Sequence, residues 1–100
     1  MAFDKATIQK VWEKATPVAN NDPARWRKDE CGAWIGFKEY GNRKSDYGWE
    51  MDHIVPAKPG QKDDDSLSNL RPLHWENNVR KSDGTLDCIV TSQGKKNVRV

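Results

Sequence analysis

The sequence has little cysteine, and its two cysteines lie far apart. Cys31 and Cys88 are the two in 100 residues, and neither belongs to a Cys-x-x-Cys pair. Closely spaced cysteine or histidine pairs are typical of structural zinc sites, and several cysteines are typical of disulfide frameworks. We therefore expect free, partly buried thiols in a reducing compartment. A zinc site built from Cys31, Cys88, His53 and His74 is disfavoured because its ligands lack that close spacing.

Long hydrophobic runs are also missing. The N-terminal segment Met-Ala-Phe-Asp-Lys-Ala has no basic region followed by an apolar core, so we do not expect a secretory signal peptide. No apolar run approaches the length of a membrane span. Together with the expected free thiols, these features predict a soluble, cytoplasmic protein.

Hydrophobic residues make up only 35% of the chain, and the net charge is only +2. Five tryptophans nevertheless supply area to bury, so 100 residues suffice for one small core but not for two. We expect one folded domain over residues 1–100. The small net charge does not by itself indicate a nucleic-acid-binding protein, and the clusters of basic residues are most simply solvated surface.

Periodicity and turn residues predict both helices and strands. Asp4 is a candidate N-cap for a helix whose apolar residues recur at helical spacing. Pro23 is expected to open a short helical turn, and Pro72 marks its strand as an edge strand. The expected elements are a helix over 5–15, strands over 31–37, 49–53 and 70–73, a helix over 75–82 closed by Asp83-Gly84, and a hairpin of 85–91 with 97–100.

The stretch from Trp49 to Lys81 contains the residue types that phosphodiester hydrolysis needs. Asp52 and His53 place an acid beside an imidazole at the end of an expected strand. A hard cation neutralises the phosphate, and an unperturbed histidine, with a pKa of about 6.5, suits a general base. Adjacent strand residues point to opposite faces, so a bent backbone is needed if both side chains are to serve one site.

Each candidate residue also has a simpler explanation. An isolated Asp-His pair is more often a surface hydrogen bond, and Asn69 suits a turn. Asn77 and Asn78 suit a helix start, and the choice between them as a ligand stays open. His74 is a structural histidine first, and an auxiliary ligand or phosphate contact second. The acidic run over 62–65 lacks the pattern of a calcium loop, so we expect it to be solvated.

Taken in order, these residues resemble the HNH endonuclease family, also called ββα-metal nucleases. The matching segments are Asp52-His53-Ile54-Val55-Pro56, Ser68-Asn69-Leu70, Asn77-Asn78 with Lys81, and, upstream, Arg27-Lys28-Asp29, Cys31-Gly32-Ala33 and Tyr47-Gly48-Trp49-Glu50. The main resemblance covers Gly48 to about Asp83, roughly a third of the chain. It implies an α+β fold: a ββα-metal (HNH/His-Me finger) unit with an N-terminal helix, an additional upstream strand and a C-terminal hairpin.

The resemblance also implies an activity and a role for each residue. The protein would be a metal-dependent endonuclease that hydrolyses DNA phosphodiester bonds. His53 would be the general base, Asn69 would brace the loop, and Asp52 and Asn78 would hold one divalent ion. The residues expected at the phosphate or nucleic acid are Arg80, Lys81 and His74. Because the last motif residue is Asn rather than His, the oxygen ligands favour Mg²⁺ or Mn²⁺ over Zn²⁺ or Ni²⁺.

The partner that the resemblance implies is nucleic acid, in the first place double-stranded DNA, and no membrane. The modest net charge supports a second hypothesis, because tight DNA binding at physiological salt usually needs more cations. In that case the chain is a nucleic-acid-binding or packaging-associated HNH module with little activity on its own, working with a partner such as a phage terminase. Divalent-dependent nicking by the isolated chain distinguishes the two hypotheses.

Overall fold

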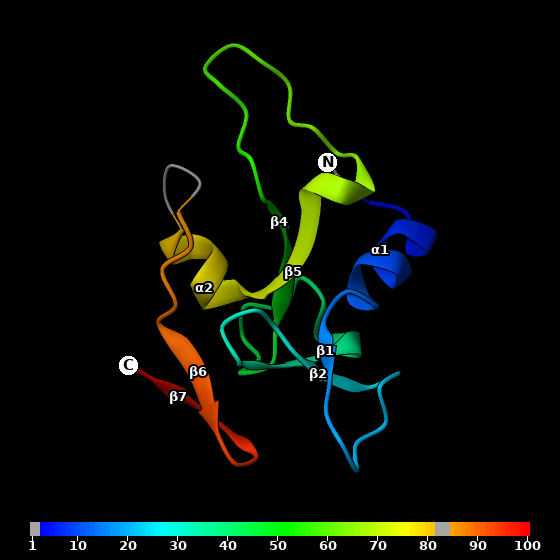
Figure 1. The fold of residues 1–100 in the computed structure, drawn as a ribbon, viewed down its shortest axis with the longest axis vertical. Coiled ribbons are helices and arrows are strands. Elements are labelled where there is room, and N and C mark those ends of the chain that lie inside the picture. Colours follow the sequence, from blue (N-terminus) through cyan, green and yellow to red (C-terminus); the bar gives the residue numbers. More distant parts are fainter. Residues whose placement is uncertain (1–2, 82–84) are drawn as a thin grey trace.

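The computed structural model describes residues 3–81 and 85–100. Its helices are α1 (Lys5–Trp12) and α2 (Trp75–Arg80), with short 3-10 helices η1 (Phe37–Glu39) and η2 (Leu67–Asn69). Its strands are β1 (Thr16–Pro17), β2 (Trp26–Lys28), β3 (Trp34–Gly36), β4 (Trp49–His53), β5 (Leu70–His74), β6 (Val90–Gln93) and β7 (Lys96–Arg99). They form three antiparallel sheets, β1-β2-β3, β4-β5 and β6-β7, and α1 and α2 lie on opposite sides of β4-β5 (Figure 1). The described chain is therefore a small mixed α and β structure, as expected.

Helix α1 begins where the sequence predicts. The Asp4 side chain accepts a hydrogen bond from the Thr7 backbone N–H at 2.8 Å, which satisfies one of the free donors of the first turn. The helix ends at Trp12 rather than near Ala15. The N–H groups of Lys14 and Ala15 bond the carbonyls three residues back, so the last turn tightens out of α geometry.

The hydrophobic core lies between α1, β3, β4 and β5. Its buried members are Val11, Trp12, Ala15, Ile35, Trp49, Met51 and Leu70. The Trp12 ring packs on Phe37 and Trp49, with ring centroids 5.5 and 5.4 Å away. Trp49 is fully buried, as expected of a tryptophan that supplies area to the core. This core fixes one face of β4 against α1.

Strand β2 was not expected from the sequence. The chain turns at Asp22, whose carbonyl accepts from the N–H groups of Arg25 and Trp26, and then runs antiparallel to β3. Because strand side chains alternate, one face of this sheet carries Ile35 and packs into the core. The other face carries Trp26, Lys28 and Trp34, and it points away from the core.

Strands β4 and β5 pair over their full length, and α2 follows directly. The register places Trp49 opposite His74 at one end and His53 opposite Leu70 at the other. The loop between them, residues 54–66, extends from the His53 end (Figure 1). The expected strands and the helix after them are confirmed, while the expected stop at Asp83-Gly84 lies outside the described residues.

The expectation of free thiols is wrong. Cys31 and Cys88 form a disulfide, with their Cα atoms 5.5 Å apart across 57 positions of sequence. The bond joins the turn before β3 to the segment before β6, two regions that only tertiary packing brings together. The thiol argument for a reducing compartment therefore no longer holds, and neither cysteine is available to zinc.

The C-terminal hairpin is confirmed, with β6 beginning at Val90 rather than Thr85. Its turn contains Gly94 with a φ of 61°, a conformation that glycine adopts without strain. The buried Asn97 side chain fixes the hairpin to β3 by exchanging hydrogen bonds with the Trp34 backbone N–H and C=O at 2.6 and 3.0 Å. Within the described ranges, neither helix is long and apolar enough to cross a bilayer.

Candidate functional site

Asp52 is a buried carboxylate held by two cations. Its side chain is 4% exposed and lies 2.7 Å from Arg71 Nε and 2.8 Å from Lys81 Nζ. Arg71 stands directly opposite on β5, and Lys81 caps the end of α2. A buried carboxylate requires such partners, since an unpaired charge in the interior is strongly destabilising. The sequence analysis did not single out Arg71, because it is the pairing register of β4 and β5 that brings Arg71 opposite Asp52.

Asn78 reaches the same side of β4 from α2. Its Nδ2 donates to Glu50 Oε1 at 2.9 Å, and Glu50 lies two residues before Asp52 on the same strand face. Burial opposes ionisation of Glu50, but hydrogen bonds from Arg43 and Asn78 outweigh it, so the pKa of Glu50 lies below its usual value. The Asn78 Oδ1 has no hydrogen-bond partner among the described residues. Asp52 and Asn78 thus face the same β4–α2 interface, although no hydrogen bond joins them.

His53 lies on the other face of β4. It is the last residue of the strand, its ring centroid is 6.4 Å from that of Phe3, and its Nε2 is 2.7 Å from Asp65 Oδ1 in the loop. Strand β4 is regular as far as His53, and the chain then leaves it. Asp52 and His53 therefore flank the end of the strand from opposite sides.

Asn69 joins the two ends of the loop beside His53. Its Oδ1 accepts from the Val55 N–H at 2.9 Å, and its Nδ2 donates to the carbonyls of Val55 and Asp64 at 3.1 and 2.9 Å. The Ile54 N–H also bonds the Asn69 carbonyl at 2.8 Å. The side chain is buried, so these bonds are shielded from water. Asn69 consequently fixes the backbone that follows His53.

Asn77 is fully buried and uses its whole amide. Its Oδ1 accepts from the N–H groups of Ile89 and Val90, and its Nδ2 donates to the Val90 carbonyl and to Asp29 Oδ2. Asn77 therefore has no oxygen left for a metal, unlike Asn78. Its role in the structure is to join α2 to the hairpin.

Asp29 is a second buried carboxylate, and it has no cationic partner among the described residues. Its oxygens accept from the backbone N–H groups of Cys31, Ala33 and His74 and from Asn77 Nδ2, at 2.8 to 3.1 Å. Burial raises the pKa of Asp29 above its usual value, and the four donors limit that rise. Asp29 thus ties the turn before β3 to the start of α2. Sequence reasoning gave it no such role.

His74 is fully buried at the N-cap of α2. Its Nδ1 accepts from the Glu76 N–H at 3.1 Å, so Nε2 carries the proton and donates to the Asp46 carbonyl at 2.8 Å. Both ring nitrogens are thus engaged within the protein. His74 is therefore a structural residue, and its buried side chain is not accessible to a phosphate.

His74 also belongs to a group of potential metal ligands with Asp46 and Glu76, whose ligand atoms lie within 4.8 Å of one another. Arg99 forms ion pairs with both carboxylates, and His74 has no free lone pair in its neutral form. The group lies at the Trp49 end of β4, about 13 Å from His53 at roughly 3.3 Å per strand residue. We therefore interpret it as an ion-pair network.

The two expected phosphate-binding cations differ in exposure. The Lys81 side chain is only 7% exposed and bonds Asp52 and the His53 carbonyl. The Arg80 side chain is 61% exposed and lies 3.2 Å from Asp87. Arg80 is therefore accessible to a ligand as the structure stands, whereas Lys81 acts on Asp52.

Two antiparallel strands followed by a helix, with polar side chains gathered where they meet, are compatible with an HNH domain. A family model described as HNH endonuclease matches residues 31–84, more than half of the chain. The chain belongs to the HNH endonuclease family. Searches among curated proteins and among solved structures found no match. Membership of this family indicates a nuclease acting on nucleic acid, and such nucleases typically use a divalent metal.

Proposed function

We propose that this protein is a metal-dependent endonuclease that nicks DNA at the His53 end of β4. One observation carries the proposal: within an HNH-family chain, Asp52 and His53 flank the end of β4 where Asn69 closes the loop. Because the two side chains leave β4 on opposite faces, the proposal requires the chain to bend at His53 so that the carboxylate and the imidazole both reach one phosphate. The proposed nucleic acid is double-stranded DNA.

The proposed metal site suits a hard divalent ion. Asp52 offers carboxylate oxygens, and Asn78 offers an amide oxygen without a partner among the described residues. Oxygen ligands of this kind fit Mg²⁺ or Mn²⁺. Such an ion, when bound, would neutralise charge on the phosphate that is cleaved. Because Lys81 already balances the charge of Asp52, the ion must compete with its ammonium group.

The proposed general base is His53, and the proposed role of Asp65 is to orient its imidazole ring. If the Nε2–H of a neutral ring donates to Asp65, the lone pair of Nδ1 is free to take a proton from water. The carboxylate would then stabilise the imidazolium that forms, as the aspartate does in hydrolase triads. General-base catalysis contributes on the order of 10²–10⁴-fold to rates.

Plasmid nicking in the presence of Mg²⁺ or Mn²⁺ tests the proposal. We expect His53→Ala to lower the nicking rate about 10²–10⁴-fold while metal affinity, measured by calorimetry, stays the same. Cleavage by His53→Ala at the parent rate would remove the mechanism.

Asp65→Asn, compared with Asp63→Asn in the same acidic run, tests the contact with the base. Asp63 has no side-chain hydrogen bond within the described residues, so its variant serves as a matched control. We expect the nicking rate to fall for Asp65→Asn and to stay at the parent value for Asp63→Asn. Equal rates for the two variants would mean that Asp65 does not act through His53.

A second candidate function rests on the pairing of cations near the site. Arg43, Arg71, Arg80 and Lys81 each form an ion pair with a carboxylate of the chain, so their charge is already balanced. Fewer free cations mean weaker sequence-independent DNA affinity. The candidate is a packaging-associated module that cuts poorly alone. Robust nicking by the isolated chain at physiological salt would exclude it, whereas nicking only with a terminase present would favour it.

A further inference from the structure

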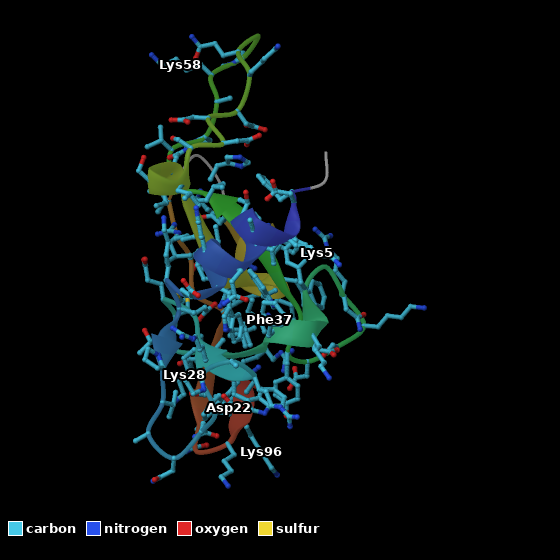
Figure 2. All side chains as sticks on the ribbon, turned by 90° about the vertical axis from the view of Figure 1, so that its right-hand side faces the viewer. Lys5, Asp22, Lys28, Phe37, Lys58 and Lys96 are labelled. Carbon is cyan, nitrogen blue, oxygen red and sulfur yellow. A yellow bond between two sulfur atoms is a disulfide. The ribbon has the colours of Figure 1, made fainter. Side chains whose placement is uncertain are left out.

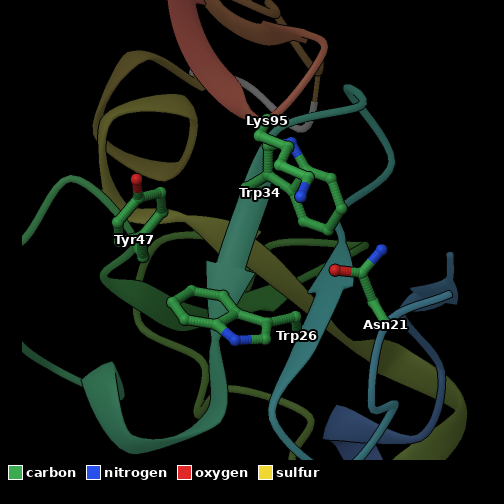
Figure 3. A pocket seen from close by; sticks show the side chains of 5 residues that line it. All are labelled: Asn21, Trp26, Trp34, Tyr47 and Lys95. Carbon is green, nitrogen blue, oxygen red and sulfur yellow. The ribbon is translucent and has the colours of Figure 1, made fainter.

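A hollow of about 200 Å³ lies on the outer face of the β1-β2-β3 sheet, away from the proposed catalytic end. Its lining residues are Asn21, Trp26, Trp34, Tyr47 and Lys95 (Figure 3). Pockets for drug-sized ligands are roughly 300–1,000 Å³, so this one suits a single flat ring system. Figure 2 shows Lys28 and Lys96 at this end of the molecule and Lys58 of the 54–66 loop at the other.

The aromatic walls are built by the sheet itself. Trp26 pairs across the strands with Gly36, and a Cβ on Gly36 would approach the Trp26 ring to 3.1 Å, so the missing side chain makes room for the indole. Tyr47 meets the Trp26 ring edge to face, with centroids 5.1 Å apart. Trp34 is held by its Nε1–H, which donates to the Gly94 carbonyl at 2.8 Å. The walls are thus fixed before any ligand arrives.

The pocket also has polar groups that the protein does not use. Four of the five indole N–H groups donate to backbone carbonyls; these belong to Trp12, Trp34, Trp49 and Trp75. The Trp26 N–H has no acceptor within residues 3–81 and 85–100, and neither the Asn21 Oδ1 nor the Lys95 ammonium has a partner there. A ligand with a flat ring, a hydrogen-bonding edge and negative charge would stack on the indoles, donate to the Asn21 Oδ1 and pair with the Lys95 ammonium.

Aromatic pockets commonly bind either nucleobases or organic cations. The charge around this pocket favours a nucleotide over an organic cation. Lys28 already lies over the Trp34 ring, 4.8 Å from its centroid, and Lys95 lines the pocket. Two ammonium groups repel a quaternary ammonium ligand but attract phosphate. Aromatic side chains beside cations are how proteins bind the bases of single strands.

We propose that this pocket binds one unpaired nucleobase of the nucleic acid, with its phosphate near Lys95. This inference rests on the proposed function and deepens it by naming the substrate class: a duplex with an unpaired or single-stranded flank. The sheet and the β6-β7 hairpin lie at the end opposite the 54–66 loop, so the bound base is separated from the scissile phosphate (Figure 1). The pocket therefore selects substrates without taking part in the chemistry.

The test compares the affinities of an overhang duplex and a blunt duplex, measured by fluorescence anisotropy in EDTA so that no cutting occurs. Stacking on one aromatic ring changes affinity about 5- to 150-fold. We expect Trp26→Ala and Lys95→Glu each to reduce the preference for the overhang at least five-fold, with Trp26→Phe retaining most of it. Lys5→Glu, at an exposed lysine on α1, makes the same change of charge as Lys95→Glu and should keep the preference. Because Lys95 is exposed in a turn, its variant tests the pocket even if Trp26→Ala fails to fold.

A ¹⁵N NMR titration with hexathymidylate or with tetramethylammonium provides an independent readout. We expect the oligonucleotide to shift the Trp26 indole resonance while that of Trp12, bonded to the Pro23 carbonyl, stays in place. An unchanged overhang preference in both Trp26→Ala and Lys95→Glu overturns the inference, as does a Trp26 shift caused only by tetramethylammonium. If the parent fails to nick but the oligonucleotide still shifts the Trp26 resonance, the proposed nuclease function is wrong and the inference that the pocket binds a nucleobase is supported. If nicking persists without an overhang preference, the pocket alone fails.

Discussion

Asp29→Asn tests whether a buried carboxylate holds the start of α2 in place. The substitution keeps the size of the side chain but replaces one acceptor oxygen by an N–H₂ group. Two of the four N–H donors around Asp29 would then meet another donor. Hydrogen bonds to a charged group contribute about 1.5–3 kcal/mol each, so two losses amount to about 3–6 kcal/mol. Relief from burying a charge offsets part of this, and we expect a net loss of about 2–4 kcal/mol.

Urea unfolding followed by tryptophan fluorescence measures that loss. With a slope of about 2 kcal/mol per molar urea, the midpoint should fall by about 1–2 M. Asp22→Asn is the matched control: Asp22 is exposed, and an asparagine oxygen can still accept from the Ala24 N–H, so its midpoint should move little. If the midpoint for Asp29→Asn equals that of the control, the Asp29 carboxylate does not hold the start of α2 in place.

The pH dependence of the same comparison follows from the raised pKa of Asp29. Burial makes the folded protein hold this proton more tightly than the unfolded chain, whose value is near 3.8. The stabilisation from Asp29 protonation is therefore complete below the unfolded pKa and declines as pH rises through the folded pKa. The difference in unfolding free energy between parent and Asp29→Asn should thus be larger at pH 4 than at pH 7. A difference that grows with pH would contradict the assigned direction.

Three further outcomes are expected. Replacing both Cys31 and Cys88 by serine should lower the unfolding free energy by about 4 kcal/mol, since the disulfide closes a loop of 57 positions, and reduction of the parent should reproduce the loss in a melting experiment. Asn69→Ala removes three side-chain hydrogen bonds next to His53, so nicking should fall at least ten-fold while calorimetric metal affinity changes little; equal losses of both would indicate general unfolding instead. Lys81→Met should tighten Mn²⁺ binding, because a competing ammonium is removed from Asp52, and weaker binding would show that Lys81 supports the site.

Several elements were predictable because their signals are local. Asp4 caps α1 through a residue three positions away, and alternating apolar residues marked β4, whose buried Trp49 and Met51 face the core. Strand β2 was missed because it is only three residues long, begins three positions after Pro23 and carries no apolar alternation; pairing with β3 is what makes these residues a strand. Local preference is a weak guide where cross-strand contacts decide.

The sequence is enough to recognise the family, and the order and spacing of Asp52, His53, Asn69 and Asn78 predict them as the residues of its site. Which groups each of these residues contacts depends on how distant segments of the chain pack. Packing joins Cys31 to Cys88 and surrounds Asp29 with four hydrogen-bond donors. It also gives the two adjacent asparagines different contacts, since Asn77 bonds Asp29 and Asn78 bonds Glu50. Burial and hydrogen-bond saturation require segments that are far apart in the sequence to pack together, whereas the spacing of a motif depends only on neighbouring positions.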